Sequence, residues 1–304
     1  MPQKAVYSTC AVLLCWGMQA GAQVRGVYPL GMSATNSGTI PDPGFTYTNM
    51  FLLYSRDRLT DASGAVTAEG EHSVLMDMNT ITWVSEKEFL GGAHYSFAVT
   101  LPIANNSLSS EAAGPISGGG GLADTFYQPA ILGWRTDRAS FRIAYGFLAP
   151  TGRFDAGAND NVGSGYWTHV LSSGQTFVLG QRRATIVSAF QMYEFHGVQS
   201  GTDIQPGDTI SLDYSVMRVI GSQADPLVQV GFVGYSQRQV SAKSGPTVTP
   251  EEGAARYKVD ALGIGAIVSW HDRRASLGFK YFDELSSEST FEGHSLQISA
   301  SIAF

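Results

Sequence analysis

The chain has 304 residues, of which 43% are hydrophobic, 11% aromatic and 15% charged, and its formal net charge is −7. The charged fraction is well below the roughly 25% of an ordinary soluble domain, yet apolar residues are too plentiful for a disordered chain. The negative charge argues against a nucleic acid partner and against anchoring on an anionic lipid surface.

Residues 1–22 have the features of a secretory signal peptide. Lys4 is the only charged residue, an apolar stretch is densest over residues 11–18, and Ala-Gly-Ala at the end of the segment is a cleavage signal. We therefore expect cleavage between Ala22 and Gln23. Export across the inner membrane follows from this prediction.

The cysteines of the chain, Cys10 and Cys15, both lie in the predicted signal peptide. The mature chain then holds no disulfide, no thiolate metal site and no cysteine nucleophile. No other stretch reaches 18 apolar residues, the length that a helical membrane span needs. The open choices are an exported soluble β-protein and an outer-membrane barrel.

Helical periodicity is nearly absent, and apolar and polar residues alternate with the period of a β-strand. The last segment alternates most cleanly, with apolar residues at every second position from Leu296 to Phe304. We predict an all-β chain of twelve strands. They cover residues 45–58, 71–84, 93–102, 122–136, 139–149, 164–172, 184–196, 208–220, 227–240, 256–270, 274–284 and 294–304.

The predicted connections alternate in length. Short turns such as 136–138 and 271–273 alternate with longer segments rich in Gly, Ser, Pro and acidic residues. The longer segments are 103–121, which contains four consecutive glycines and is expected to be a flexible loop, 150–163, 197–207 and 241–255. This sorting is the pattern of an up-and-down transmembrane β-barrel. An even strand number places both chain ends on the periplasmic side.

The alternation also assigns faces. In the strand at 139–149, Phe141, Ile143, Tyr145 and Phe147 are expected to face lipid. Polar residues at the opposite positions of several strands are candidates for the lumen, namely Arg142, Asp213, Lys280 and Gln297. The final residue, Phe304, fits the aromatic C-terminus that is typical of bacterial outer-membrane barrels.

Three stretches of the sequence resemble one protein family. They are YPLG at 28–31 with PDPGF at 41–45, GLAD at 121–124 with QP at 128–129, and APTGRFD at 149–155 with GYWT at 165–168. The set resembles the proteobacterial outer-membrane proteins named for the meta-pathway of phenol degradation, over nearly all of the mature chain. The resemblance implies a barrel associated with transport of aromatic or other hydrophobic compounds, and it carries over no catalytic or binding residues.

Motifs for catalysis and cofactors are not found in the sequence. The six histidines lack the spacing of a helical zinc site, and neither His196 with Ser200 nor His294 with Ser295 resembles a hydrolase motif. We expect no cofactor, no metal and no enzymatic activity. Two groups of charged residues are candidates for the lining of an entrance, or alternatively are rim residues solvated at the headgroup level. They are Arg56, Asp57 and Arg58 at the top of the first predicted strand, and Arg153 and Asp155 in the loop at 150–163.

Three parts of the chain are thus distinguished: the signal at 1–22, an irregular segment at 23–44, and the barrel at 45–304. The irregular segment either plugs the lumen or is a periplasmic tail. We predict a passive channel for small hydrophobic or aromatic solutes in the outer membrane of a Gram-negative bacterium, surrounded by its lipids and inserted by the barrel-assembly machinery. The alternatives are a surface-exposed structural or adhesion barrel and an outer-membrane enzyme such as a lipid hydrolase.

Overall fold

A computed structural model describes residues 25–110, 114–158, 160–220, 226–271 and 274–304. The predicted signal peptide and its cleavage position between Ala22 and Gln23 lie outside the described residues. Among the described residues, no helix is long and apolar enough to cross a bilayer. The elements are β1 (Gly44–Thr60), β2 (Val66–Phe89), β3 (Ala93–Ser110), β4 (Gly114–Leu122), β5 (Thr125–Arg135), β6 (Ala139–Ala149), β7 (Thr168–Leu179), β8 (Thr185–His196), β9 (Thr209–Ile220), β10 (Leu227–Gln239), α1 (Pro250–Ala254), β11 (Lys258–Trp270), β12 (Ala275–Glu288) and β13 (Phe291–Ala303).

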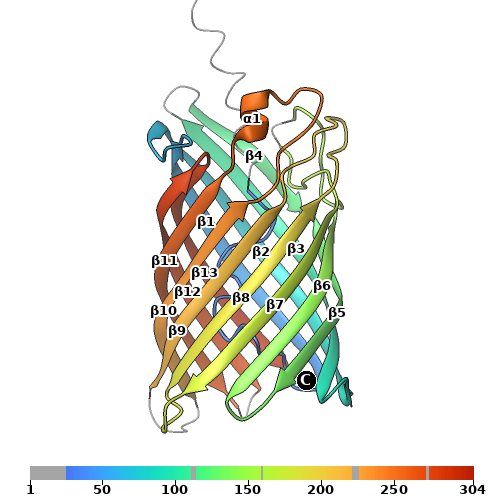
Figure 1. The fold of residues 1–304 in the computed structure, drawn as a ribbon, viewed down its shortest axis with the longest axis vertical. Coiled ribbons are helices and arrows are strands. Elements are labelled where there is room, and N and C mark those ends of the chain that lie inside the picture. The colour runs from blue at the N-terminus through green and yellow to red at the C-terminus, as the bar shows by residue number, and fades with distance from the viewer. Residues whose placement is uncertain (1–24, 111–113, 159, 221–225, 272–273) are drawn as a thin grey trace, which may run out of the picture.

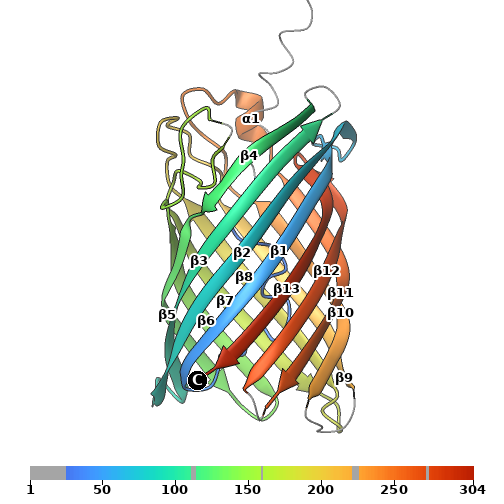
Figure 2. The same ribbon diagram turned by 180° about the vertical axis from the view of Figure 1, so that it is seen from behind.

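All strands but β4 close into an antiparallel ring of twelve (Figures 1 and 2). Each strand of the ring pairs with the next one along the chain, and β1 pairs with β13 to complete it. Closure gives every strand of the ring a partner on both sides, which is how backbone groups are satisfied where water is absent. The predicted twelve-strand barrel is confirmed.

The prediction of a flexible loop at 103–121 is wrong. The structure extends β3 to Ser110 and adds β4, which pairs Gly114 with Ser110 and Leu122 with Ile103. This hairpin rises beyond the ring (Figure 2). Backbone pairing requires no alternation of side chains, so a glycine-rich segment without a periodic pattern can still pair with the edge of a long strand.

The predicted sixth strand also shifts along the chain, because β7 begins at Thr168 instead of residue 164 and continues to Leu179. The residues before it are held in a loop by Asp124. Its carboxylate accepts hydrogen bonds from the backbone nitrogen and hydroxyl of Ser164, at 2.7 and 2.5 Å, and from the backbone nitrogen of Gly152 at 3.0 Å.

The long connections gather at one end of the barrel and the short turns at the other (Figure 1). The C-terminus and the start of β1 lie at the end with the short turns, which we call the lower end. At the upper end, α1 interrupts the loop between β10 and β11. Thr249 and Glu252 form a reciprocal capping box at its N-terminus, a pairing that satisfies two free helix donors.

The two faces of the strands differ as the alternation requires. On β6, Phe141, Ile143 and Tyr145 are outward and 38–50% exposed, whereas Arg142 is on the inner face and contacts the luminal residue Ser33. Buried polar residues recur on the inner faces of the other strands, for example Ser211, Asp213 and Ser215 on β9. The exterior is therefore an apolar surface, and the interior is a polar, filled lumen.

Aromatic side chains cluster on the exterior near both ends of the barrel. Trp83 lies 5.5 Å from Phe97 between ring centroids, close to the β2–β3 turn at the lower end. Tyr127 stacks on Phe147 at 5.3 Å, and Phe147 lies 5.9 Å from Trp167, near the upper ends of β5, β6 and β7. Two aromatic girdles that flank an apolar band are the exterior of a membrane-spanning barrel.

The substitution Ile143→Arg tests this assignment of faces. The side chain lies near the middle of β6 and is 50% exposed on the outer face, so the charge would enter hydrocarbon at a cost of about 2–4 kcal/mol in the free energy of unfolding. Leu179→Arg, at the lower end of β7, is the matched control and should cost roughly 0–1 kcal/mol. Urea unfolding in lipid vesicles measures both, and equal losses would contradict the assignment.

Candidate functional site

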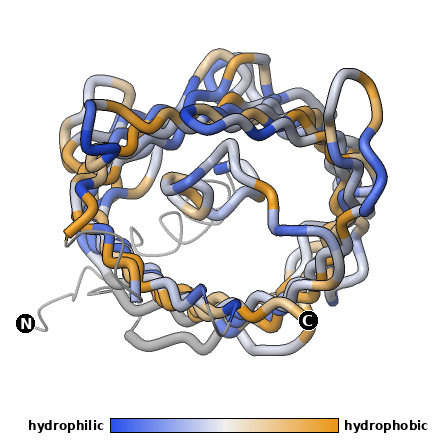
Figure 3. Tube along the Cα trace, turned by 90° about the horizontal axis from the view of Figure 1, so that it is seen from below, coloured by the Kyte–Doolittle hydropathy of each residue, from blue (hydrophilic) through white to orange (hydrophobic). Residues whose placement is uncertain are grey.

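Residues 25–43, which we call the luminal segment, lie inside the ring of strands (Figures 1 and 3). Arg25 contacts β12 near the upper end, and Ile40 packs against β5 and β6 before β1 begins at the lower end. The segment therefore descends through the lumen. Arg25 consequently lies near the long loops, at the end opposite to the periplasmic side expected for the start of the mature chain.

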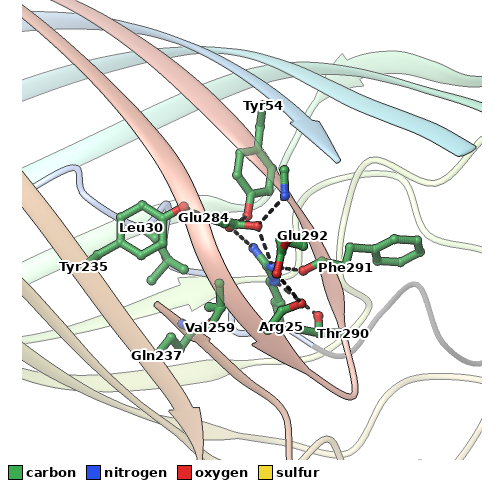
Figure 4. Close-up of polar contacts among 12 residues, drawn as sticks. Arg25, Leu30, Tyr54, Tyr235, Gln237, Val259, Glu284, Thr290, Phe291 and Glu292 are labelled. Carbon is green, nitrogen blue, oxygen red and sulfur yellow. Dashed lines mark hydrogen bonds and ion pairs between the residues drawn. The ribbon is translucent and has the colours of Figure 1, made fainter. Parts of the chain in front are cut away.

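The upper contact of the luminal segment is an ion pair between Arg25 and Glu284 of β12 (Figure 4). The two guanidinium nitrogens lie 2.6 and 3.0 Å from the two carboxylate oxygens. Glu284 also accepts hydrogen bonds from the hydroxyls of Tyr54 and Tyr235 and from the backbone nitrogen of Gly293. A buried carboxylate with these donors is fully compensated.

A second carboxylate, that of Glu194 of β8, binds the backbone of the luminal segment at Tyr28. It is fully buried and accepts hydrogen bonds from the backbone nitrogen of Tyr28 at 2.9 Å and from the hydroxyl of Thr209. The amide of Gln237 reaches it at 3.4 Å. Glu194 has no cationic partner among the described residues, so neutral donors alone satisfy it.

Asp213 of β9, one of the predicted lumen residues, is the central anchor. Its carboxylate accepts from the hydroxyl of Tyr28 at 2.5 Å and from the backbone nitrogens of Gly31 and Ser33, both at 3.1 Å. Its side chain is wholly buried. One carboxylate therefore fixes three points of a segment that has no regular secondary structure.

Lys280 and Gln297, also predicted to face the lumen, donate hydrogen bonds to the luminal segment, whereas Asp213 accepts them. The Lys280 ammonium donates to the carbonyls of Gly31 and Met32, both at 2.7 Å, and the Gln297 amide donates to the carbonyl of Leu30 at 2.8 Å. A buried irregular chain needs such donors because its carbonyls have no ladder or helix partner.

Arg142, the remaining predicted lumen residue, contacts the lower half of the segment. Its guanidinium lies 3.3 Å from the Ser33 hydroxyl and 5.2 Å from the centre of the Phe190 ring. Further down, Arg135 of β5 forms an ion pair with Asp42 at 2.9 Å. These contacts tie the segment to the wall down to its exit.

Two glycines let the segment touch the wall directly. A Cβ atom on Gly38 would lie 2.1 Å from the carbonyl oxygen of Ser140, and one on Gly174 of β7 would lie 2.0 Å from that of Ser37. Neither position tolerates a side chain without a backbone shift. Strand and luminal segment are thus in backbone-to-backbone contact here.

Between the luminal segment and the wall formed by β1, β2 and β13 lies a cavity of about 170 Å³. Its apolar lining comes from both sides, with Leu52, Val74 and Met76 on the wall and Pro29 and Leu30 on the segment. An apolar protein cavity of about 150 Å³ accepts benzene. The volume therefore matches one small aromatic molecule.

The rim residues proposed for an entrance in the loop at 150–163 are occupied within their own loop. Arg153 forms an ion pair with Asp160 at 3.2 Å and donates to its carbonyl at 2.6 Å. The backbone nitrogen of Asp155 donates to the side chain of Asn161 at 2.8 Å. The loop at 150–163 is thus internally bonded, and an entrance role for Arg153 and Asp155 stays a prediction.

Phe304 lies at the lower end of the barrel, and its side chain is exposed. Its backbone nitrogen donates to the carbonyl of Phe45 at 2.8 Å, so the last residue continues the pairing of β13 with β1.

Neither proposed Ser–His pair is assembled. His294 faces outward on β13, whereas Ser295 is buried on the inner face. The ring of His196 contacts the hydroxyl of Thr168 at 2.9 Å, and Ser200 is exposed. Among the described residues, no group of three His, Cys, Asp or Glu side chains could hold a metal ion.

Several luminal residues are missing from the candidates that the sequence analysis selects. Arg25, Glu194 and Glu284 all belong to or contact the luminal segment. Arg56, by contrast, is one of the residues predicted for an entrance, and it lines the cavity beside the segment. The position of Glu194 could be recognised from the sequence, because this acidic residue stands between Tyr193 and Phe195 at an inward position of an alternating strand. No sequence feature identifies Arg25 as a luminal residue, because its contacts depend on the path of a segment that has no periodic pattern.

The fold is shared with solved outer-membrane structures. The COG4313 outer membrane channel from Pseudomonas putida F1 superposes with a TM-score of 0.72 at 13% identity, covering 92% of this chain and 100% of that one. The β domain of the Bordetella autotransporter BrkA superposes with a TM-score of 0.53 at 13% identity, covering 86% and 100%. No curated protein matches the sequence.

A family model described as "Putative MetA-pathway of phenol degradation" matches residues 56–300. The matched region runs from the upper part of β1 to the lower part of β13 and so contains nearly the whole ring. The resemblance seen in the sequence motifs is thereby confirmed, and the chain is a member of this phenol-degradation family of β-barrel proteins.

Proposed function

We propose that the protein is a passive outer-membrane channel for small hydrophobic or aromatic compounds. The observation that carries this proposal is the lumen itself. The luminal segment lies inside the ring of strands (Figure 3), and a cavity of about 170 Å³ with apolar side chains in its lining lies between the segment and the wall. Such an interior favours one small apolar molecule at a time over bulk diffusion of hydrated solutes.

The comparisons support the same function. The family description refers to phenol degradation, and the structure from Pseudomonas putida F1 is named a channel. A ring of twelve strands is also narrower than a porin of 16–18 strands.

Liposome swelling with the purified protein tests the proposal. Small aromatic solutes should enter faster than sugars and amino acids of similar size, with protein-free liposomes as the baseline. Equal rates for all solutes would indicate a general pore, and no uptake of any solute by folded protein would overturn the channel function.

Two tryptophan substitutions at neighbouring positions sharpen this test. Leu52→Trp places an indole in the cavity, and aromatic flux should fall severalfold. Leu53→Trp is the matched control because the next residue of β1 is outward and 38% exposed, and flux should stay unchanged. A loss of flux in both variants would attribute the effect to general damage of the barrel.

A further inference from the structure

The cavity beside the luminal segment contains one positive charge that has no carboxylate partner among the described residues. Arg56 of β1 lines it, and the guanidinium lies 4.3 Å from the centre of the Tyr54 ring. Its Nε is buried and makes no hydrogen bond, and among the described residues no carboxylate lies within ion-pair distance of the side chain. Arg56 is half-buried, and a guanidinium withdrawn from water in this way favours a compensating anion.

The neighbouring acids are already occupied. Glu284 is bonded to Arg25 on both of its oxygens, and Glu292 forms an ion pair with Arg58 at 2.8 Å. Arg25 lies on the same Tyr54 ring at 5.5 Å and adds a second positive charge to the cavity lining. Arg25 and Arg56 together therefore exceed the nearby carboxylate of Glu284 by one positive charge.

A second polar group without a hydrogen-bond partner lines the same cavity. Ser295 of β13 lines the cavity and is 1% exposed, and its hydroxyl has no hydrogen-bond partner among the described residues. A serine hydroxyl can donate to an anion. The register places Ser295 directly opposite Tyr54 and Gly293 opposite Arg56 on the paired strands β1 and β13. Both free donors thus lie on adjacent strands at one end of the cavity.

Apolar side chains make up a further part of the lining, which also includes Tyr28, Tyr54 and Gln237. Leu52, Val74 and Met76 form the wall below the free donors, and Leu30 closes the other side. The cavity of about 170 Å³ thus combines a guanidinium and a hydroxyl donor with apolar side chains, and its whole volume suits a molecule of single-ring size. A neutral hydrocarbon would leave the guanidinium uncompensated, and a small inorganic anion would leave the apolar part of the cavity unfilled.

We propose that this cavity is a binding site for single-ring aromatic carboxylates, with the carboxylate at Arg56 and Ser295 and the ring against Leu52, Val74 and Met76. The inference rests on the proposed channel function and specifies its solute class. Guanidinium–carboxylate pairing is geometrically specific and strengthened by charge, so the site discriminates the acid from its neutral analogues.

Binding is measured by fluorine NMR titration of the full mature protein in a nonionic detergent. The probes are para-fluorobenzoate, the isosteric neutral para-fluorobenzamide, and fluoroacetate, which keeps the carboxylate without the ring. The benzoate should bind at least tenfold more tightly than either of the others. Equal binding of the amide would overturn the role of the charge, and equal binding of fluoroacetate would reduce the site to a general anion site.

Matched variants test whether the benzoate binds in the cavity at Arg56. Arg56→Gln should weaken benzoate binding at least tenfold and leave the amide unchanged, whereas Arg58→Gln, two residues along β1 and already paired with Glu292, should bind like the parent protein. If Arg56→Gln fails to fold, as judged by heat-modifiable migration in gels, Leu52→Trp keeps the charge and should abolish benzoate binding by filling the ring compartment. Unchanged benzoate binding in a folded Arg56→Gln or Leu52→Trp variant would overturn the proposal.

These measurements separate the two proposals. Benzoate binding without flux of any solute into liposomes would reject the channel function and leave the site standing. Flux of neutral aromatics with no preference for the carboxylate would reject the site and leave the channel standing.

Discussion

Deletion of residues 25–39 is expected to raise the single-channel conductance of the reconstituted barrel severalfold. The luminal segment occupies the interior from Glu284 near the upper end to Arg135 at the lower end, and it touches the wall so closely that Gly38 and Gly174 have no room for a side chain. Its removal opens a continuous aqueous path. Recordings in planar lipid bilayers measure the change.

The barrel should survive this deletion. The wall residues that lose partners, among them Glu194, Asp213 and Lys280, would face luminal water, which can solvate them. A control variant replaces the same residues with a Gly–Ser sequence of equal length, and its conductance should fluctuate between the parent and the deletion levels. If the deletion leaves conductance at the parent level, the segment does not limit the path.

Asp213→Ala should release the luminal segment without removing it. The carboxylate accepts from Tyr28, Gly31 and Ser33, and each hydrogen bond to a charged group contributes about 1.5–3 kcal/mol. Loss of this anchor leaves the carbonyl contacts of Lys280 and Gln297 as the remaining central ties. The segment should therefore detach in part, with frequent transitions to a higher conductance.

A nitroxide label at position 35 reports the motion directly, since residues 25–304 contain no native cysteine. The label spectrum should become markedly more mobile in Asp213→Ala. Ser215→Ala is the matched control, because Ser215 lies two residues away on the same inner face of β9 and its hydroxyl has no partner among the described residues. Equal mobility in the two variants would show that Asp213 is not the anchor.

The strands of this barrel are largely predictable from the sequence, because outward apolar residues alternate with inward polar residues along each strand. Phe141, Ile143 and Tyr145 alternate with Arg142 on β6, and the structure places the two sets on opposite faces. The hairpin of β3 and β4 is not predictable in this way. Its glycines at 118–121 have no side chains to alternate, and pairing depends only on the free edge of β3.

The luminal contacts are harder to predict for a different reason. Asp213 and Lys280 stand out because they interrupt alternating strands with charge at inward positions. Their partners are backbone atoms of Gly31, Met32 and Ser33, and backbone groups are the same in every residue. Only the path of the segment decides which carboxylate meets which nitrogen, and no local pattern encodes that path.

The position of the luminal segment also constrains how the molecule assembles. The segment leads directly into β1, and β1 is the strand that seals the ring against β13. Contacts of the segment with β8, β9 and β12 join residues more than 160 positions apart in the chain, and contacts of such high sequence separation carry a large entropic cost of loop closure. Because the luminal segment is continuous with β1, pairing of β1 with β13 and enclosure of the segment by the ring (Figure 3) are coupled in the finished fold.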